Sequence, residues 1–136
     1  MNHIANPSIK SLAKNLKSLF KEIRDRNDTD IKFNCSFKSF INEFRTFKIK
    51  LPRRLGNTTL AQVLRDNKTI YVCASHTFMP NNIEYKCTKR EFKEYIKDKK
   101  YNLIICDNCS INIELLKSVD TKDNKIIVLY IGEIHE

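Results

Sequence analysis

Three short runs of almost wholly apolar residues constrain the fold of this chain more than any other feature. They are "TIYVCAS" at 69–75, "YNLIIC" at 101–106 and "KIIVLYI" at 125–131, and each is rich in β-branched or aromatic side chains. A shorter strand-like run, "FKIKL", occupies residues 47–51. Strands without polar alternation are typical of parallel sheets that helices cover on both faces.

Helical patterns lie before and between these runs. Residues 7–25 carry apolar side chains at 3-4-3-4 spacing, with Asn6 as the predicted cap and Pro7 in the first turn. The run "SFKSFINEFRTF" at 36–47 places five apolar side chains on one helical face: Phe37, Phe40, Ile41, Phe44 and Phe47. Three more helices are predicted: 58–67, 88–100 (capped by Thr88) and 110–119.

Alternation of strand and helix predicts an α/β fold with a small, mainly parallel sheet covered by helices. We expect an α-helical N-terminal extension at 1–45, packed on an α/β core at 46–136. The 136 residues are enough for one domain with its own core, so both parts are expected to form a single domain.

The composition bounds the partners and the compartment. A net charge of +9 and a pI near 9.4 favour a polyanionic partner such as nucleic acid. The basic residues of the helix at 7–25 form either a solvated face or a nucleic-acid-binding stripe. No apolar run approaches the ~18 residues of a membrane span, and no signal peptide is recognised, so we expect a soluble, cytoplasmic protein without a membrane partner. Five cysteines without a secretory signal indicate reduced thiols.

The segment "LPRRLGNTTL" at 51–60 has features of a phosphate-binding loop. In the pattern G-x-x-x-x-G-K-[ST], backbone N–H groups surround the phosphates, the lysine reaches them and the hydroxyl ligates magnesium. Gly56 takes the second glycine position and Thr58 the hydroxyl position. Leu51 replaces the first glycine and Asn57 replaces the lysine. The segment lies between a predicted strand and a predicted helix, as this mechanism requires.

A second motif lies about 45 residues downstream. The apolar strand in "NLIICDN" ends in Asp107, where a phosphate-loop protein places the acidic residue beside magnesium. The chain has two glycines, Gly56 in the loop and Gly132 after the last strand. Placing one of two glycines in the loop indicates a backbone geometry that other residues resist.

The motifs "RRLGNTT" and "NLIICDN" make residues 46–133 resemble the compact P-loop NTPases of phages and other mobile elements, which are distant relatives of terminase and helicase motor domains. The resemblance implies ATP and Mg²⁺ as ligands. Magnesium would lie between Thr58 and Asp107. The residues implied in phosphate binding are Arg53, Arg54, Gly56, Asn57, Thr58 and Thr59.

Two departures from that family weaken catalysis. Asn57 supplies no ammonium group, which typically costs about 2–4 kcal/mol of transition-state stabilisation. Asn108 stands where many relatives have the glutamate that activates water, and an amide is no base. We therefore expect binding of nucleotide or nucleic-acid phosphate with little or no hydrolysis. Since Asn57 is also a good N-cap, "GNTTL" could instead be an ordinary helix start.

Two other functions stay open from the sequence. The chain could be a non-enzymatic interaction module that uses the fold as a scaffold for a host or viral protein partner, such as a phage inhibitor of a host protein. It could also be a zinc-stabilised nucleic-acid binder, because Cys73-x-x-His76 and Cys106-x-x-Cys109 form a set of four ligands. Against zinc, Cys73 and Cys106 lie within apolar strands, where cysteine is usually a core residue.

A nuclease is a weaker alternative. Glu84-x-Lys86 matches half of a nuclease metal site, and Asp66 is the candidate for the missing aspartate. Asp66 is predicted at a helix end rather than on an adjacent strand, which disfavours this interpretation.

Overall fold

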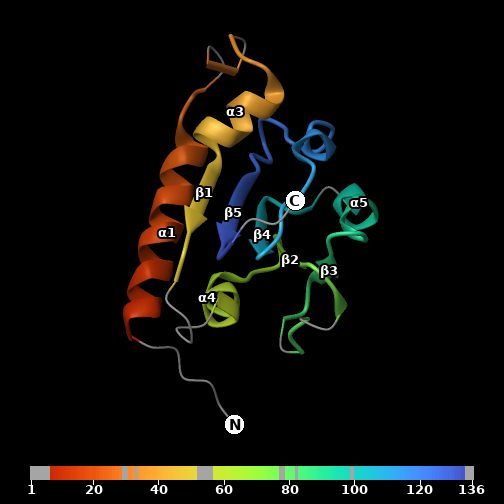
Figure 1. The fold of residues 1–136 in the computed structure, drawn as a ribbon. Coiled ribbons are helices and arrows are strands. Elements are labelled where there is room, and N and C mark those ends of the chain that lie inside the picture. The colour runs from red at the N-terminus through yellow and green to blue at the C-terminus, as the bar shows by residue number, and fades with distance from the viewer. Residues whose placement is uncertain are drawn as a thin grey trace.

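A computed structural model describes most of the chain: residues 7–28, 31–32, 34–51, 57–76, 79–81, 83–98 and 100–133. Five strands form one sheet in which every neighbouring pair is parallel, and helices lie on both of its faces (Figure 1). The prediction of an α/β fold with a parallel sheet is confirmed.

The sheet has the spatial order β1-β5-β4-β2-β3. The strands are β1 (Thr46–Ile49), β2 (Thr69–Cys73), β3 (Lys86–Thr88), β4 (Leu103–Asp107) and β5 (Ile127–Ile131). The three apolar runs form β2, β4 and β5, and all the residues of β2 and β5 are buried. The register aligns Asp107 with both Cys73 and Ile131, so β2, β4 and β5 end at the same level.

The helical segments are α1 (Pro7–Asp25), α3 (Phe37–Phe44), α4 (Asn57–Leu64), α5 (Phe92–Tyr95), and the 3-10 helices η2 (Ile96–Asp98) and η3 (Ile113–Leu116). The predicted helix at 7–25 is confirmed at both ends. Ser36 caps α3, because its side chain accepts a hydrogen bond from the Ser39 N–H.

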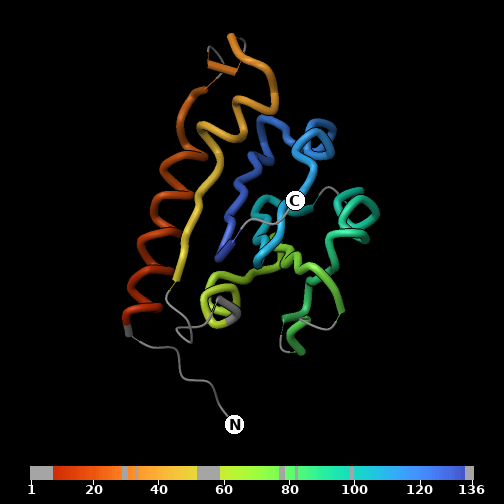
Figure 2. Tube along the Cα trace, viewed as in Figure 1, coloured from red at the N-terminus to blue at the C-terminus, as the bar shows by residue number. Residues whose placement is uncertain are grey.

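One face of the sheet is covered by α1 and α4, which Figure 2 shows as the red and yellow-green coils. Leu16 and Phe20 of α1 pack with Leu60 of α4 in the same buried cluster as Ile105 and Leu129. At the end of α1, the guanidinium of Arg24 donates to the carbonyl oxygens of Asn102 (2.8 Å) and Lys125 (3.2 Å). The N-terminal helix is therefore joined to the sheet by both apolar packing and hydrogen bonds.

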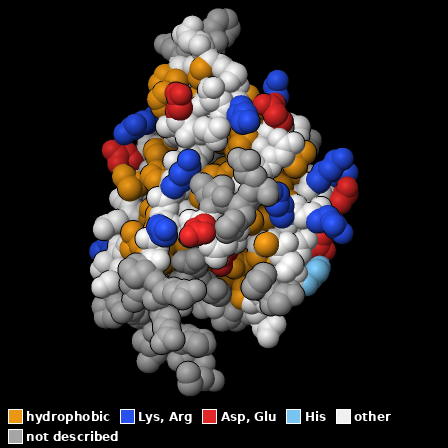
Figure 3. All heavy atoms as spheres, viewed as in Figure 1, with side chains coloured by type: hydrophobic (Ala, Val, Ile, Leu, Met, Phe, Trp, Pro, Cys, Tyr) orange, Lys and Arg blue, Asp and Glu red, His pale blue; other side chains and the backbone are white. Residues whose placement is uncertain are grey.

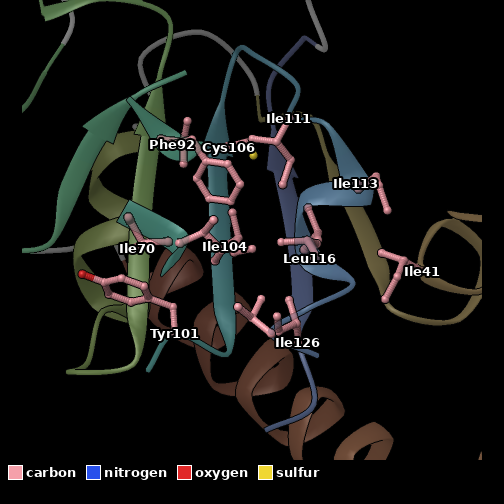
Figure 4. Packing of buried hydrophobic residues seen from close by; sticks show 14 of the residues in the cluster. Ile41, Ile70, Phe92, Tyr101, Ile104, Cys106, Ile111, Ile113, Leu116 and Ile126 are labelled. Atoms are coloured by element: carbon pink, nitrogen blue, oxygen red, sulfur yellow. The ribbon is translucent and has the colours of Figure 1, made fainter. Parts of the chain in front are cut away.

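The opposite face is covered by α3, α5, η2 and η3. Figure 4 shows Ile104 of β4 between Ile70 of β2 and Leu116 of η3. Even-numbered residues of β2 and β4 face this cluster and odd-numbered residues face α1 and α4. This alternation also determines toward which face of the sheet the side chain of a polar residue at a strand end points.

Three local predictions were wrong. The regular helix predicted at 88–100 begins only at Phe92, because residue 88 still belongs to β3. Thr88 nevertheless caps the turn that leads into the helix: its hydroxyl accepts from the N–H of Glu91 (3.3 Å), and its own N–H donates to the Glu91 carboxylate (3.0 Å). The helix predicted at 110–119 is reduced to the 3-10 turn η3. Phe44 is 42% exposed and does not share the buried face of Phe40 and Ile41, and Phe47 lies in β1, as the predicted strand at 47–51 requires, and not on the helical face.

In the described ranges, no helix is both long enough and apolar enough to cross a membrane.

Candidate phosphate-binding edge of the sheet

The candidate site lies at the carboxyl edge, which we define as the edge where the five parallel strands end. In open parallel sheets, ligands bind beyond the carboxyl ends of the strands. The helix α4 begins at this edge, since it follows β1 and precedes β2. Asn57 and Thr58 are its first two residues, and Thr59 follows half-buried. Arg53, Arg54 and Gly56 lie outside the described residues.

Asp107 is the last residue of β4 and lies between two hydrogen-bond donors. The hydroxyl group of Tyr71, on the neighbouring strand β2, donates to Oδ2 of Asp107. The side-chain amide of Asn108 donates to Oδ1 at 3.2 Å. Asp107 follows Ile105 in the strand alternation, so it belongs to the face covered by α4, and α4 contacts β4. The start of α4 and the Asp107 carboxyl group therefore share one face and one edge of the sheet.

Asn108 ties the carboxyl ends of two strands together. Its backbone has φ 53°, a left-handed conformation that asparagine tolerates better than most residues. Its N–H donates to the carbonyl of Ile131 (2.9 Å), and its Oδ1 accepts from the N–H of Glu133 (2.9 Å). Gly132, with φ 81°, donates its N–H to Ile49 of β1 at 2.8 Å. The residue that the family resemblance places at a lost catalytic position thus has a structural role here.

The far end of the same edge carries a second polar group beside β3. Both the backbone N–H and the hydroxyl of Thr88 donate to Oε1 of Glu91, each at 3.0 Å. These bonds hold the pKa of Glu91 below its usual value. Nε2 of His76 lies 3.5 Å from the same carboxylate, and the His76 side chain is 72% exposed. Glu91 therefore has three polar contacts with two residues, Thr88 and His76, and joins the turn at residue 76 to β3.

The structure does not assemble the predicted zinc ligands. Cys106 and Cys109 interact in the cluster covered by α3 and α5, Cys73 belongs to the cluster on the opposite face of the sheet, and His76 lies on the surface beside Glu91. Burial raises the pKa of the Cys106 thiol, and a hydrogen bond from Cys106 lowers the pKa of Cys109. Among the described residues, no three His, Cys, Asp or Glu side chains are grouped to hold a metal ion. Zinc stays a sequence prediction, which the metal content of the purified protein tests.

The nuclease alternative receives only partial support from the geometry. Asp66 and Glu84 line the same cavity of about 240 Å³ beside β2. The ammonium group of Lys86 is turned to the Pro80 carbonyl oxygen at 2.7 Å, and Oδ1 of Asp66 accepts from Lys68 and Thr69. Each group therefore completes a local turn instead of converging on one ion.

On the face of the molecule that Figure 3 shows, the positive charges are spread out and form no single cluster. Figure 3 shows Lys and Arg side chains spread over this face, with acidic side chains between them. On this face, the net charge of +9 therefore raises the general attraction for polyanions without forming one continuous basic patch.

Sequence reasoning missed Tyr71, whose hydroxyl group orients Asp107. The strand run "TIYVC" predicted a buried aromatic residue at this position, and only the strand order places it next to β4. It also missed the ion network that we define as Asp28, Lys32, Arg45 and Asp120, at the opposite edge of the sheet. These four residues come from three separate segments, so no local pattern connects them.

Comparison with known proteins adds no relative to this picture. A scan against protein-family models and searches of curated proteins and solved structures found no match to this chain. The resemblance to P-loop NTPases therefore stays a prediction from two short sequence motifs.

Proposed function

We propose that this protein binds nucleotide or nucleic-acid phosphate at the carboxyl edge of its sheet, with little or no hydrolysis. It would be a degenerate P-loop protein of viral or mobile-element origin, acting in the cytoplasm. One observation carries the proposal: the first turn of α4 and the carboxyl group of Asp107 lie on the same face and edge of a parallel sheet. A helix N-terminus supplies N–H donors for phosphate, and a carboxylate is a ligand that magnesium prefers.

The strand order is compatible with a magnesium–nucleotide ligand. Only β5 separates β1, which leads into the loop, from β4, which ends in Asp107. Two strand spacings amount to about 10 Å, a distance that a polyphosphate chain with its metal ion can span. Tyr71 and Asn108 would hold the Asp107 carboxylate in place beside the ion.

The same edge explains why turnover is expected to be slow or absent. Asn57 provides no ammonium group for the charge that develops during phosphoryl transfer. Asn108 is an amide, and its Oδ1 is occupied by the N–H of Glu133. The position next to Asp107 thus carries an amide that orients the carboxylate and not a carboxylate base that would activate water.

The test is a calorimetric titration of the purified protein with ATP, with and without Mg²⁺. We expect magnesium-dependent binding that is lost in the Arg53→Ala/Arg54→Ala variant, because these two guanidinium groups would replace the missing lysine charge. Lys14→Ala/Lys17→Ala removes the same charge from the exposed face of α1 and is expected to bind as the wild type does.

A variant that should bind ATP more tightly provides a second test of the proposal. Asn57→Lys restores the ammonium group at the start of α4 and is expected to strengthen ATP binding by about tenfold, since hydrogen bonds to charged groups contribute about 1.5–3 kcal/mol. If neither the wild type nor Asn57→Lys binds ATP, and the wild type binds no oligonucleotide either, the proposal is wrong.

One observation favours the alternative function, a non-enzymatic interaction module. Ile31 and Phe44 are each 42% exposed, and together with Ile23 and Phe47 they line a cavity of about 310 Å³ beside the edge strand β1. Exposed apolar side chains around a hollow are typical of protein-binding surfaces. A partner that is retained after nuclease and nucleotide treatment and is lost in Phe44→Ala would support this function.

A further inference from the structure

A cleft of about 660 Å³ opens at the amino edge, which we define as the edge where β1 and β5 begin. It lies between the segment that follows α1, the end of α3 and the turn that precedes β5. All the described residues that line it are polar or charged, and its cations are Arg26, Lys32, Arg45, Lys122 and Lys125. Five of its nine described lining residues are cations, so the cleft attracts an anionic group.

The ion network forms the floor of the cleft. Arg45 is 1% exposed, and its Nη2 lies 2.6 Å from Oδ2 of Asp28. Its Nη1 lies 3.4 Å from Oδ1 of Asp120 and also donates to the carbonyl of Ile126. Nζ of Lys32 lies 2.7 Å from Oδ2 of Asp120, whose side chain is fully buried. The charges of the two cations and the two carboxylates cancel, so the floor has no net charge. The hydrogen bonds between these groups hold the floor in place.

The rim of the cleft carries the excess charge. Among the described residues that line the rim, three are cations and one is a carboxylate, which leaves two positive charges in excess (three minus one). The cations are Arg26, Lys122 and Lys125, and the carboxylate is Asp25. Arg26 forms an ion pair with Glu22 at 3.8 Å, and both side chains are more than 60% exposed, so that pair contributes little to stability. Nζ of Lys125 donates to the carbonyl of Arg26 at 2.6 Å, which holds the two sides of the rim together.

This arrangement is hard to explain by stability alone. Buried ion networks are often no more stabilising than apolar residues of the same volume, and breaking one is costly. A neutral, fixed floor beneath a rim with two excess positive charges complements phosphate: a terminal phosphate group carries about −1.5 to −2 charges near pH 7, and each phosphodiester of a strand carries one. We propose that this cleft binds a phosphate group, carried by a free nucleotide or by a nucleic-acid strand, at a site separate from the carboxyl edge.

The experiment uses the full chain in the Arg53→Ala/Arg54→Ala background, without magnesium, so that binding at the carboxyl edge does not contribute. The probes are inorganic pyrophosphate and a 12-residue oligothymidylate. We expect both to bind, and Arg26→Ala/Lys122→Ala to weaken binding by about tenfold or more, as the loss of charge-assisted hydrogen bonds implies. Both residues are exposed, so the fold should persist, which circular dichroism checks.

Lys93→Ala/Lys97→Ala is the matched control, because it removes two exposed lysines from α5 and η2, which do not line the cleft. Amide chemical shifts provide a readout independent of affinity. We expect pyrophosphate to shift the amides of residues 121–125 and not that of Asn108.

The proposal is overturned if neither pyrophosphate nor oligothymidylate binds, if both double variants weaken binding equally, or if the bound probe shifts Asn108 in place of residues 121–125. Tighter binding of the oligonucleotide than of pyrophosphate identifies a strand as the source of the phosphate, and the reverse order identifies a small ligand. Failure here leaves the proposed ATP site intact, because that site is tested by the loop variants with magnesium present.

Discussion

At the scale of single residues, Asp28 is a carboxyl group whose charge is coupled to folding. Burial alone would raise its pKa, but the hydrogen bond and the charge of Arg45 outweigh burial and hold the pKa below its ordinary value of 3.8. At low pH the unfolded chain therefore binds a proton at Asp28 more readily than the folded protein does. The stabilisation from Asp28 is fully present above its ordinary pKa and is lost as the pH falls through the folded value.

This coupling predicts the behaviour of Asp28→Asn. The variant should be less stable than the wild type at neutral pH, and the difference should narrow as the pH falls below the ordinary pKa of 3.8, because Asp28 of the wild type becomes protonated. Urea unfolding at a series of pH values measures both free energies. Asp123→Asn, at an exposed position, is the control and should follow the wild type throughout. A difference for Asp28→Asn that stays constant with pH would contradict the coupling.

At the scale of elements, α1 decides whether the N-terminal region is an appendage or part of the core. Leu16 is 4% exposed and packs in the cluster beneath α1 and α4, whereas Leu19 on the same helix is 44% exposed. The two leucines have the same helix propensity, so their substitutions differ only in what each side chain contacts. They form a matched pair for measuring how strongly α1 is held to the sheet.

Leu16→Ala is expected to lower the free energy of unfolding by about 2–5 kcal/mol, because it removes buried apolar surface and leaves a cavity. Leu19→Ala should change it by no more than about 0.5 kcal/mol beyond its small effect on helix propensity. Both values come from urea unfolding followed by circular dichroism. Equal effects of the two substitutions would mean that α1 does not hold its position on the sheet in solution.

At the scale of the whole molecule, the reactivity of the five thiols shows whether solvent reaches the core. Cys73, Cys87, Cys106 and Cys109 are buried, and only Cys35 is partly exposed. Burial raises the pKa of Cys87 to about 12, which further suppresses its reactive thiolate.

We therefore expect one thiol to react rapidly with a disulfide reagent in the native protein and five to react after unfolding. Cys35→Ser should abolish the rapid reaction while leaving four slow thiols. Rapid reaction of two or more thiols in the native protein would show that the carboxyl ends of β2 and β4 open to solvent.

The sequence predicted the fold better than it predicted the site. The apolar runs determined β2, β4 and β5, because a strand buried on both faces requires such side chains wherever it lies. The 3.6-residue pattern determined α1 to the residue. The helices at 88–100 and 110–119 were overestimated, because periodicity does not reveal where β3 ends or where a short connection must turn back to the sheet.

By itself, the sequence determined the fold class, the main strands and α1, because each depends on side-chain hydrophobicity over a few neighbouring residues. It also named Asp107 as a polar residue at a strand end. Only the tertiary structure placed Tyr71 against Asp107 and brought Arg45 between Asp28 and Asp120. It also showed that Asn108 joins the ends of two strands by hydrogen bonds. These contacts depend on strand order and on segments far apart in the chain, and no local pattern encodes that order.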